Sequence, residues 1–433
     1  MKKLNITFCS SPDYTGNAKA LYVYMQKHYK NKMNLTWIVH DESKQKKLNE
    51  KGIKAILIGT PEFKKYIKTT NVFFTTHCNL TGDITKKSLY VELWHGISSK
   101  KIGFMMNHIS DDDKNWYKEI SRKIDYIIVP SEFWKIIFAA RFNLDLRQIL
   151  PIGYPKLDNI KDENAKTNLE KILNCNIEEY KKIIFYTPTF RKGCGRKSDS
   201  HFGSNIINLN KYEEEELIEY LKENKYLLCI KKHPSEESKF LNNFSNSDNI
   251  KLIEENVLNE FNYDIYNILD ASDVLITDYS SLGIEYLFLN KNVIYIDSDK
   301  KEYMNNRGIC YENYDFWSSN TAINSLDDLK KLLDKYLNDK EFQFEEKRKL
   351  FFNDLKDGGC KKICNYFFDS KGNLNSNIKP IINNSRKYYL MEEEKNKIEV
   401  ELAERRKELN SIYNSKAWRL AEKLRRIKHK IFK

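Results

Sequence analysis

The sequence predicts an α/β protein with two Rossmann-like lobes and a C-terminal helical tail, and three observations support this prediction. The chain has 433 residues, which is too long for one ordinary hydrophobic core and is typical of two domains with an added segment. Short apolar or β-branched runs alternate with stretches of helical character, which is the pattern of βαβ units in a parallel sheet. This alternation occurs twice along the chain, so we expect one parallel sheet in each lobe.

The first lobe is expected to span residues 1–155. Stretches of helical character, such as 19–30 and 62–68, separate its predicted strands. The strands are predicted at six apolar or β-branched runs, which are residues 4–9, 35–40, 54–58, 71–75, 89–94 and 125–129.

The second lobe is expected over residues 156–370, because the same alternation restarts after the sequence ILPIGYPKLD at 149–158. Helices at 326–337 and 345–368 are predicted to close this lobe, and we expect the second of them to cross back to the first lobe. Its strands are predicted at residues 182–187, 226–231, 250–253, 273–277 and 292–296.

The tail, residues 371–433, begins with a polar, linker-like stretch and continues as a charged helix at 387–413. This helix has a partial heptad seam interrupted by Arg405, so pairing of two chains through it stays open. Residues 416–433 hold eight Lys or Arg against one Glu, which is +7 of the chain's net charge of +12.

An apolar stripe runs along one face of the predicted helix at 416–433, with Trp418 at its border. Cations beside such a stripe are typical of a helix that lies on an anionic membrane surface, so we expect this segment to bind lipid rather than nucleic acid. A role in oligomerisation or in polymer binding is the alternative for this segment.

Two other features bear on location. No run of 18 apolar residues and no cleavable leader is visible, so we expect a cytoplasmic protein attached peripherally to the inner face of the membrane. The eight cysteines are scattered, and the close pair Cys360 and Cys364 matches one helical turn better than a metal site. We therefore expect reduced thiols, no disulfide and no bound metal.

Polar and basic residues follow five of the predicted strands, and parallel α/β sheets bind ligands at the carboxyl ends of their strands. Each group also has an ordinary structural explanation: Ser280 or Asp278 as a helix N-cap, Lys231 as a solvated edge, His95 as a hydrogen-bonded core residue. Together they favour a phosphorylated ligand. The strand-end residues are His95, Gly96, Lys100, Thr189, Arg191, Lys231, His233, Asp278, Ser280, Ser281, Glu285 and Arg307.

Several well-known motifs are absent from the sequence. We find no GxGxxG after the first strand, no GxxxxGK[ST], no GxSxG and no HExxH. These absences disfavour a nicotinamide-dependent dehydrogenase, a P-loop kinase, an α/β-hydrolase and a zinc protease.

The stretch WHGISSKKIG at 94–103 resembles the WHGTPLKxxG signature of the CDP-glycerol glycerophosphotransferase family, which includes polymerases and primases of bacterial teichoic acids and capsules. The likeness also covers 17–25, which looks like the family's N-terminal element. Further blocks follow in the family's order, at residues 129–144, 152–158, 184–191, 231–234, 272–296 and 303–312.

The resemblance implies a glycosyltransferase-B fold and assigns roles to individual residues. His95 becomes the general base on the acceptor hydroxyl and His233 a second essential histidine at the donor phosphates, since a neutral imidazole accepts a proton near pH 7. Glu285 is expected to accept hydrogen bonds from a ribose. Ser280, Ser281 and Arg307 are expected near the pyrophosphate, with Thr189, Arg191, Lys231 and Asp278 also on the donor side, and Gly96 and Lys100 on the acceptor side.

The predicted function is transfer of glycerol-phosphate, or a related polyol-phosphate, from a CDP-activated donor to a growing teichoic acid or capsule, with release of CMP and no cofactor. Ile97, Ser98 and Ser99 stand where the family commonly has Thr-Pro-Leu, so the acceptor stays open. The alternatives are a nucleotide-sugar glycosyltransferase for a surface polysaccharide and a non-catalytic, membrane-tethered glycan-binding protein.

Overall fold

The computed structural model forms two compact units, residues Met1–Ile381 and Ile382–Lys433. It describes residues 3–78, 88–189, 207–210, 213–231, 247–311, 314–318, 322–338, 341–353, 358–379 and 384–431.

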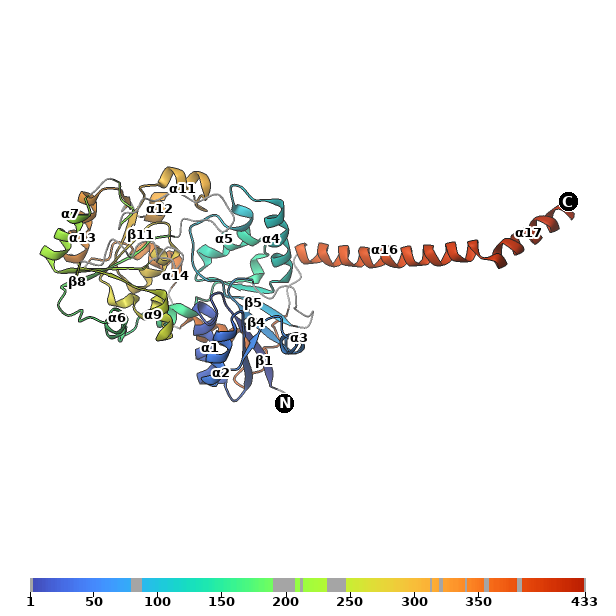
Figure 1. The fold of residues 1–433 in the computed structure, drawn as a ribbon, viewed down its shortest axis with the longest axis horizontal. Coiled ribbons are helices and arrows are strands. Elements are labelled where there is room, and N and C mark those ends of the chain that lie inside the picture. The colour runs from blue at the N-terminus through green and yellow to red at the C-terminus, as the bar shows by residue number, and fades with distance from the viewer. Residues whose placement is uncertain are drawn as a thin grey trace. The chain divides into compact units, whose positions relative to one another are not determined.

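The first sheet is entirely parallel and has the strand order β3-β2-β1-β4-β5-β6-β7. Its strands β1, β4 and β5 are labelled in Figure 1. All six predicted strands are present, and the short β7 was not predicted. The strands are continuous apolar runs because helices cover both faces of a parallel sheet and bury both sets of side chains. The strands are β1 (Leu4–Cys9), β2 (Met33–Val39), β3 (Ala55–Leu57), β4 (Val72–Thr75), β5 (Leu89–Glu92), β6 (Tyr126–Ile128) and β7 (Ile149–Leu150). The helices are α1 (Gly16–Tyr29), α2 (Glu42–Glu50), α3 (Pro61–Ile67), α4 (Asp111–Lys123) and α5 (Glu132–Phe142).

The second sheet is also parallel, in the order β10-β9-β8-β11-β12-β13, and it contains all five predicted strands. The strands are β8 (Lys182–Thr187), β9 (Tyr226–Ile230), β10 (Ile250–Leu252), β11 (Val274–Thr277), β12 (Val293–Ile296) and β13 (Ala322–Ile323). The helices around them are α6 (Ala165–Leu173), α7 (Glu214–Asn224), α9 (Glu255–Glu260), α10 (Ser281–Tyr286), α11 (Lys300–Asn306), α12 (Tyr314–Ser318) and α13 (Leu326–Asn338).

The predicted helix at 345–368 is two helices, α14 (Glu345–Phe352) and α15 (Gly359–Phe367). The chain leaves α14 at Asn353, whose φ of +52° is incompatible with a continuing helix. The predicted return to the first lobe is confirmed, because Phe367 of α15 packs edge-on against Phe74 of β4 with ring centroids 6.0 Å apart. Asp158 fixes the start of α15 by accepting the main-chain N–H groups of Gly359 and Cys360 at 2.6 and 2.9 Å.

The second unit contains the helices α16 (Asn384–Asn414) and α17 (Lys416–Ile431), as predicted for 387–413 and 416–433. Ser415 separates them, and its side chain accepts the N–H of Trp418 at 3.2 Å, which is the geometry of an N-cap. Among the residues that the structure describes, no helix is long and apolar enough to cross a bilayer.

Candidate active site

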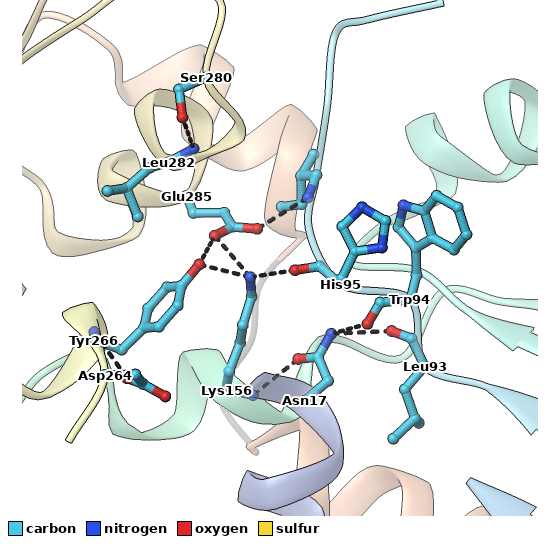
Figure 2. A network of polar contacts seen from close by, with 11 residues as sticks. Asn17, Leu93, Trp94, His95, Lys156, Asp264, Tyr266, Ser280, Leu282 and Glu285 are labelled. Atoms are coloured by element: carbon cyan, nitrogen blue, oxygen red, sulfur yellow. Dashed lines mark hydrogen bonds and ion pairs between the residues drawn. The ribbon is translucent and has the colours of Figure 1, made fainter. Parts of the chain in front are cut away.

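The turn after β5 has an unusual backbone conformation that presents His95. Trp94 has φ of +53°, in the left-handed region that a bulky residue rarely adopts. The buried carboxylate of Glu92 accepts the Trp94 N–H at 2.8 Å. Figure 2 shows the Asn17 side-chain amide, which donates to the carbonyls of Leu93 and Trp94 at 3.0 and 2.9 Å. These bonds from both sides hold the turn, because such a conformation persists only where its surroundings enforce it.

Glu92 also ties the end of β5 to the end of β4. Its carboxylate accepts the hydroxyl of Thr75 at 2.6 Å and the N–H of Cys78 at 2.9 Å, in addition to the N–H of Trp94. Burial raises the pKa of this carboxyl group to about 7, although the hydrogen bonds oppose the rise. The two loops that leave these neighbouring strands are therefore held in one fixed relation.

Two histidines stack at this edge of the sheet. The rings of His77, after β4, and His95, after β5, are 4.2 Å apart and inclined by 9°. Desolvation by the surrounding protein lowers the pKa of His95 well below 6.5 and that of His77 to about 4, and the charge of Lys156 contributes to both shifts. Both imidazoles are therefore neutral at pH 7.

The tautomer of His95 follows from its neighbour. Its Nδ1 lies 3.3 Å from the carbonyl oxygen of Thr76, and because a carbonyl can only accept, this contact assigns the proton to Nδ1. Nε2 then keeps a lone pair, and the side chain is solvent-accessible although protein surrounds it densely enough to lower its pKa. Such a nitrogen can take a proton from a hydroxyl group.

Gly96 and Ile97 lie directly against the second lobe. The Ile97 N–H donates to Glu285 Oε1 at 2.9 Å. A Cβ atom on Gly96 would lie only 3.1 Å from Ser281 Oγ and 3.2 Å from Glu285 Oε1, so glycine permits the close approach of this loop to α10.

The following residues of the same loop pair with the loop after α11. Ser99 accepts the N–H of Cys310 at 2.6 Å, Lys101 donates its N–H to Gly308 at 3.1 Å, and Lys100 forms an antiparallel bridge with Ile309. Arg307 immediately precedes this pairing. The structure therefore brings predicted acceptor-side and donor-side residues to one place.

Lys156 joins the lobes at the centre of this contact. Its ammonium group donates to the carbonyl oxygen of His95 at 2.9 Å and to the Tyr266 hydroxyl at 2.6 Å, and it lies 2.9 Å from Glu285 Oε2 (Figure 2). The side chains of Lys156 and Glu285 are only 4% and 0% exposed. Both carboxylate oxygens of Glu285 already have protein partners. Its contact with a ribose stays a prediction.

Two arginines supply positive charge beside these loops. The fully buried Arg141 donates to the carbonyl oxygens of Ser98 and Lys100, the latter at 3.0 Å, and burial lowers its pKa. Gly103 is required where it passes Arg141, because its φ is +65° and a Cβ atom would meet the Arg141 carbonyl oxygen at 1.9 Å. Arg307 has a buried Nε without a hydrogen-bond partner in the described part of the chain.

The predicted residues at the other strand ends of the second lobe have structural partners. Asp278 accepts the Thr189 hydroxyl at 2.6 Å and its N–H at 2.9 Å, which ties the end of β11 to the end of β8. Ser280 is the N-cap of α10 and accepts the N–H of Leu282 at 3.3 Å, as its structural interpretation predicted. Lys231 forms an ion pair with Glu255 at 3.1 Å.

The profile of the CDP-glycerol:poly(glycerophosphate) glycerophosphotransferase family matches residues 1–368. The chain belongs to this family. The teichoic acid glycerol-phosphate primase of Bacillus subtilis (strain 168) is 30% identical over 316 residues, which are 70% of this chain and 76% of that protein. The teichoic acid poly(ribitol-phosphate) polymerase of Bacillus spizizenii is 30% identical over 241 residues, which are 54% of this chain and 36% of that protein.

The fold of this glycerophosphotransferase also has a solved relative. The structure of the wall teichoic acid polymerase TagF matches it with a TM-score of 0.65 and 22% identity, over 83% of this chain and 86% of that one. The predicted family and the predicted pair of Rossmann-like lobes, of the glycosyltransferase-B type, are thus confirmed. Because the family consists of transferases, the alternative of a non-catalytic binding protein is not supported.

The predicted site of this glycerophosphotransferase is described only in part. His233 and Arg191 lie outside the described residues. Sequence reasoning missed His77, although it follows a predicted strand just as His95 does and the same criterion would have selected it. It also missed Arg141, for which the signal was an arginine within the apolar run FAARFNL.

Proposed function

We propose that this chain transfers a glycerol-phosphate unit from CDP-glycerol to a hydroxyl group at the end of a teichoic-acid-type polymer, with His95 as the general base. The observation that supports this most is the position of His95, whose Nδ1 contacts a carbonyl oxygen so that Nε2 can accept a proton, on a loop bonded to the second lobe at Glu285 and Gly308. A base has to lie close to both substrates, and this loop contacts both lobes.

The proposed reaction is a displacement at phosphorus. His95 Nε2 takes the proton of the acceptor hydroxyl while the oxygen of that hydroxyl bonds to the β-phosphorus of CDP-glycerol. The bond from that phosphorus to the oxygen bridging the two phosphates breaks, CMP leaves with the electron pair, and the proton on His95 is then released to water. Arg307, together with the expected His233, would stabilise the charge that develops on CMP.

The donor side of the proposal rests on two kinds of residue. Arg307 has a buried N–H that lacks a partner among the described residues, and a phosphate oxygen would satisfy it. Thr189, Asp278 and Ser280 shape the loops at the ends of β8 and β11, so we assign them to the construction of the donor pocket. We keep Ser281, Lys231 and Arg191 as further donor-side residues on the strength of their places in the family's motifs.

The test is release of CMP by the purified protein. With CDP-glycerol and a lipid-linked teichoic acid primer, we expect CMP and a lengthened primer, whereas UDP- and GDP-sugars should release no nucleotide and leave the primer unchanged. A preference for CDP-ribitol would instead identify ribitol-phosphate as the transferred unit. One relative is named as a poly(ribitol-phosphate) polymerase. Turnover of a nucleotide-sugar instead would establish the glycosyltransferase alternative.

We also propose that α17 docks the enzyme on the inner face of the membrane, where a lipid-linked acceptor would be found. Leu420, Leu424, Ile427 and Trp418 are 41% to 61% exposed, and an apolar stripe flanked by many cations is typical of an interfacial helix. Sedimentation with anionic liposomes tests this. Leu424→Glu with Ile427→Glu should abolish sedimentation.

A matched control separates the apolar stripe from simple charge. Arg425→Ala with Arg426→Ala changes the net charge by the same two units but leaves the apolar stripe intact, so it should retain more binding than the Glu variant. Equal losses in the two variants would show that charge alone brings the tail to lipid. Unchanged sedimentation of both would place the anchor elsewhere.

The pairing of two chains through α16 is a further part of the proposal. Ile398, Leu402, Leu409 and Ile412 are about half exposed and lie at heptad spacing, interrupted by Arg405. Analytical ultracentrifugation of the full chain should show a dimer that Leu402→Glu with Leu409→Glu dissociates. A monomer at micromolar concentration would remove this element of the proposal.

A further inference from the structure

We propose that Lys156 is a positioning residue for the transfer reaction, which holds the main chain at His95 through a buried link to Glu285 and Tyr266 of the second lobe. This inference rests on the proposed function of His95 as the base. It makes the placement of the base depend on contact between the two lobes.

Lys156 itself is anchored to the first lobe. It lies in the 3-10 turn Pro155–Asn159, and its N–H donates to the side-chain oxygen of Asn17 at 3.1 Å. The amide nitrogen of the same Asn17 donates to the carbonyls of Leu93 and Trp94. One asparagine thus connects the main chain of Lys156 to the left-handed turn that presents His95 (Figure 2).

The second lobe contributes the other half of the link. Glu285 lies in α10, and Tyr266 in the 3-10 turn Ile265–Asn267. Glu285 contacts the histidine loop twice, because Oε1 accepts the N–H of Ile97 directly and Oε2 pairs with the ammonium group that donates to the carbonyl of His95. The main chain is therefore held on both sides of the Gly96 peptide by one carboxylate and its partner.

Stability alone is a poor explanation for this pair. Removing an ammonium and a carboxylate from water costs about as much as their attraction returns, and apolar residues of similar size often serve a fold as well. Defined geometry is what a buried pair with several directional hydrogen bonds supplies. Here that geometry acts on the backbone of the proposed base.

The charge of Lys156 also acts on the ring of His95. Among the described residues, the charged or titratable groups that act on this histidine are His77 beside it, Arg141 of α5 and Lys156, and Glu92 lies beneath the turn, bonded to the Trp94 N–H. After burial and His77, the cations of Lys156 and Arg141 lower the pKa of His95 further. Removing the Lys156 cation should therefore raise the pKa of the base.

The decisive variant is Lys156→Met, measured for CMP release across a range of pH. Displacing a reacting group by about 1 Å costs roughly 100-fold in rate, so we expect kcat to fall by about that factor while the KM for CDP-glycerol changes little. The acid limb of kcat/KM should also move to higher pH, because the imidazole keeps its proton longer. A role confined to folding would not move this limb.

Further variants cover the case in which Lys156→Met does not fold. Lys156→Met with Glu285→Gln leaves no uncompensated buried charge and should be no less active than Lys156→Met alone, since both residues act through one link. Tyr266→Phe removes only the hydroxyl group, so kcat should fall several-fold with the acid limb unmoved.

Lys19→Met is the matched control. Lys19 also bonds across the lobes, donating to the Asn262 carbonyl at 2.8 Å, and none of its recorded contacts is with His95. Its kcat and acid limb should match the wild type. A Lys156→Met variant with a raised KM, an unchanged kcat and an unmoved acid limb would overturn the proposal. If the wild type itself releases no CMP, the proposed function fails instead.

Discussion

The loop after β5 and the strand ends of the second lobe use polar residues in opposite ways. Around His95 the main chain of residues 93–97 is bonded by the side chains of Glu92, Asn17, Lys156 and Glu285, while the imidazole keeps an acceptor nitrogen. At the ends of β8 and β11 the carboxylate of Asp278 accepts both the hydroxyl and the main-chain N–H of Thr189. The first arrangement leaves a side chain available for the proposed chemistry, and the second shapes a loop.

The comparison predicts that substitutions in the two regions affect different properties. His95→Ala removes the ring but none of the main-chain bonds, so turnover should fall by about 10²- to 10⁴-fold while the melting temperature changes little. Single-turnover CMP release and thermal melting test this together. Near-normal turnover would exclude His95 as the base.

Asp278→Ala, in contrast, should lower the stability of the fold. It leaves the buried hydroxyl and N–H of Thr189 without their acceptor, which costs about 2 to 3 kcal/mol of unfolding free energy. Chemical denaturation measures this loss, and Thr189→Val, which removes the hydroxyl but leaves the N–H bond, is the milder companion. An unchanged stability together with lost turnover would make Asp278 part of the chemistry.

Gly96→Ala tests the contact between the two regions. The added methyl group would lie 3.1 Å from Ser281 Oγ, so the loop and α10 have to separate by a few tenths of an ångström. We expect roughly a tenfold loss of kcat, in line with the sensitivity of positioned groups to small displacements. Ser281→Gly should restore part of the activity if the steric explanation is right, because it removes the atom that the methyl group meets.

The remaining prediction concerns pH. Since the pKa of His77 in the folded protein is about 4, against an ordinary value near 6.5, its neutral form contributes stability that is present above about pH 6.5 and is lost as the pH falls toward 4. His77→Gln should therefore flatten the decline of the unfolding free energy across this range. An identical decline in both proteins would mean that other groups govern it.

The strands and the family motifs were readable from sequence because both are local. An apolar run between turn signals predicts a strand wherever it occurs, and all eleven predicted strands are present. The same holds for His95, which stands directly after such a run. The break between α14 and α15 was missed although Gly358 and Gly359, which stand at the start of α15, were a readable break signal.

The sequence by itself determined the α/β class, the two lobes, the order of the motifs and the position of the proposed base, because each depends on residues that are neighbours in the chain. Only the tertiary structure decided that His77 stacks on His95, since this requires β4 and β5 to be adjacent in the sheet. It likewise decided that Lys156 forms an ion pair with Glu285, which is 129 residues further along the chain. Contacts of that separation depend on strand order and on packing between lobes, which local periodicity does not encode.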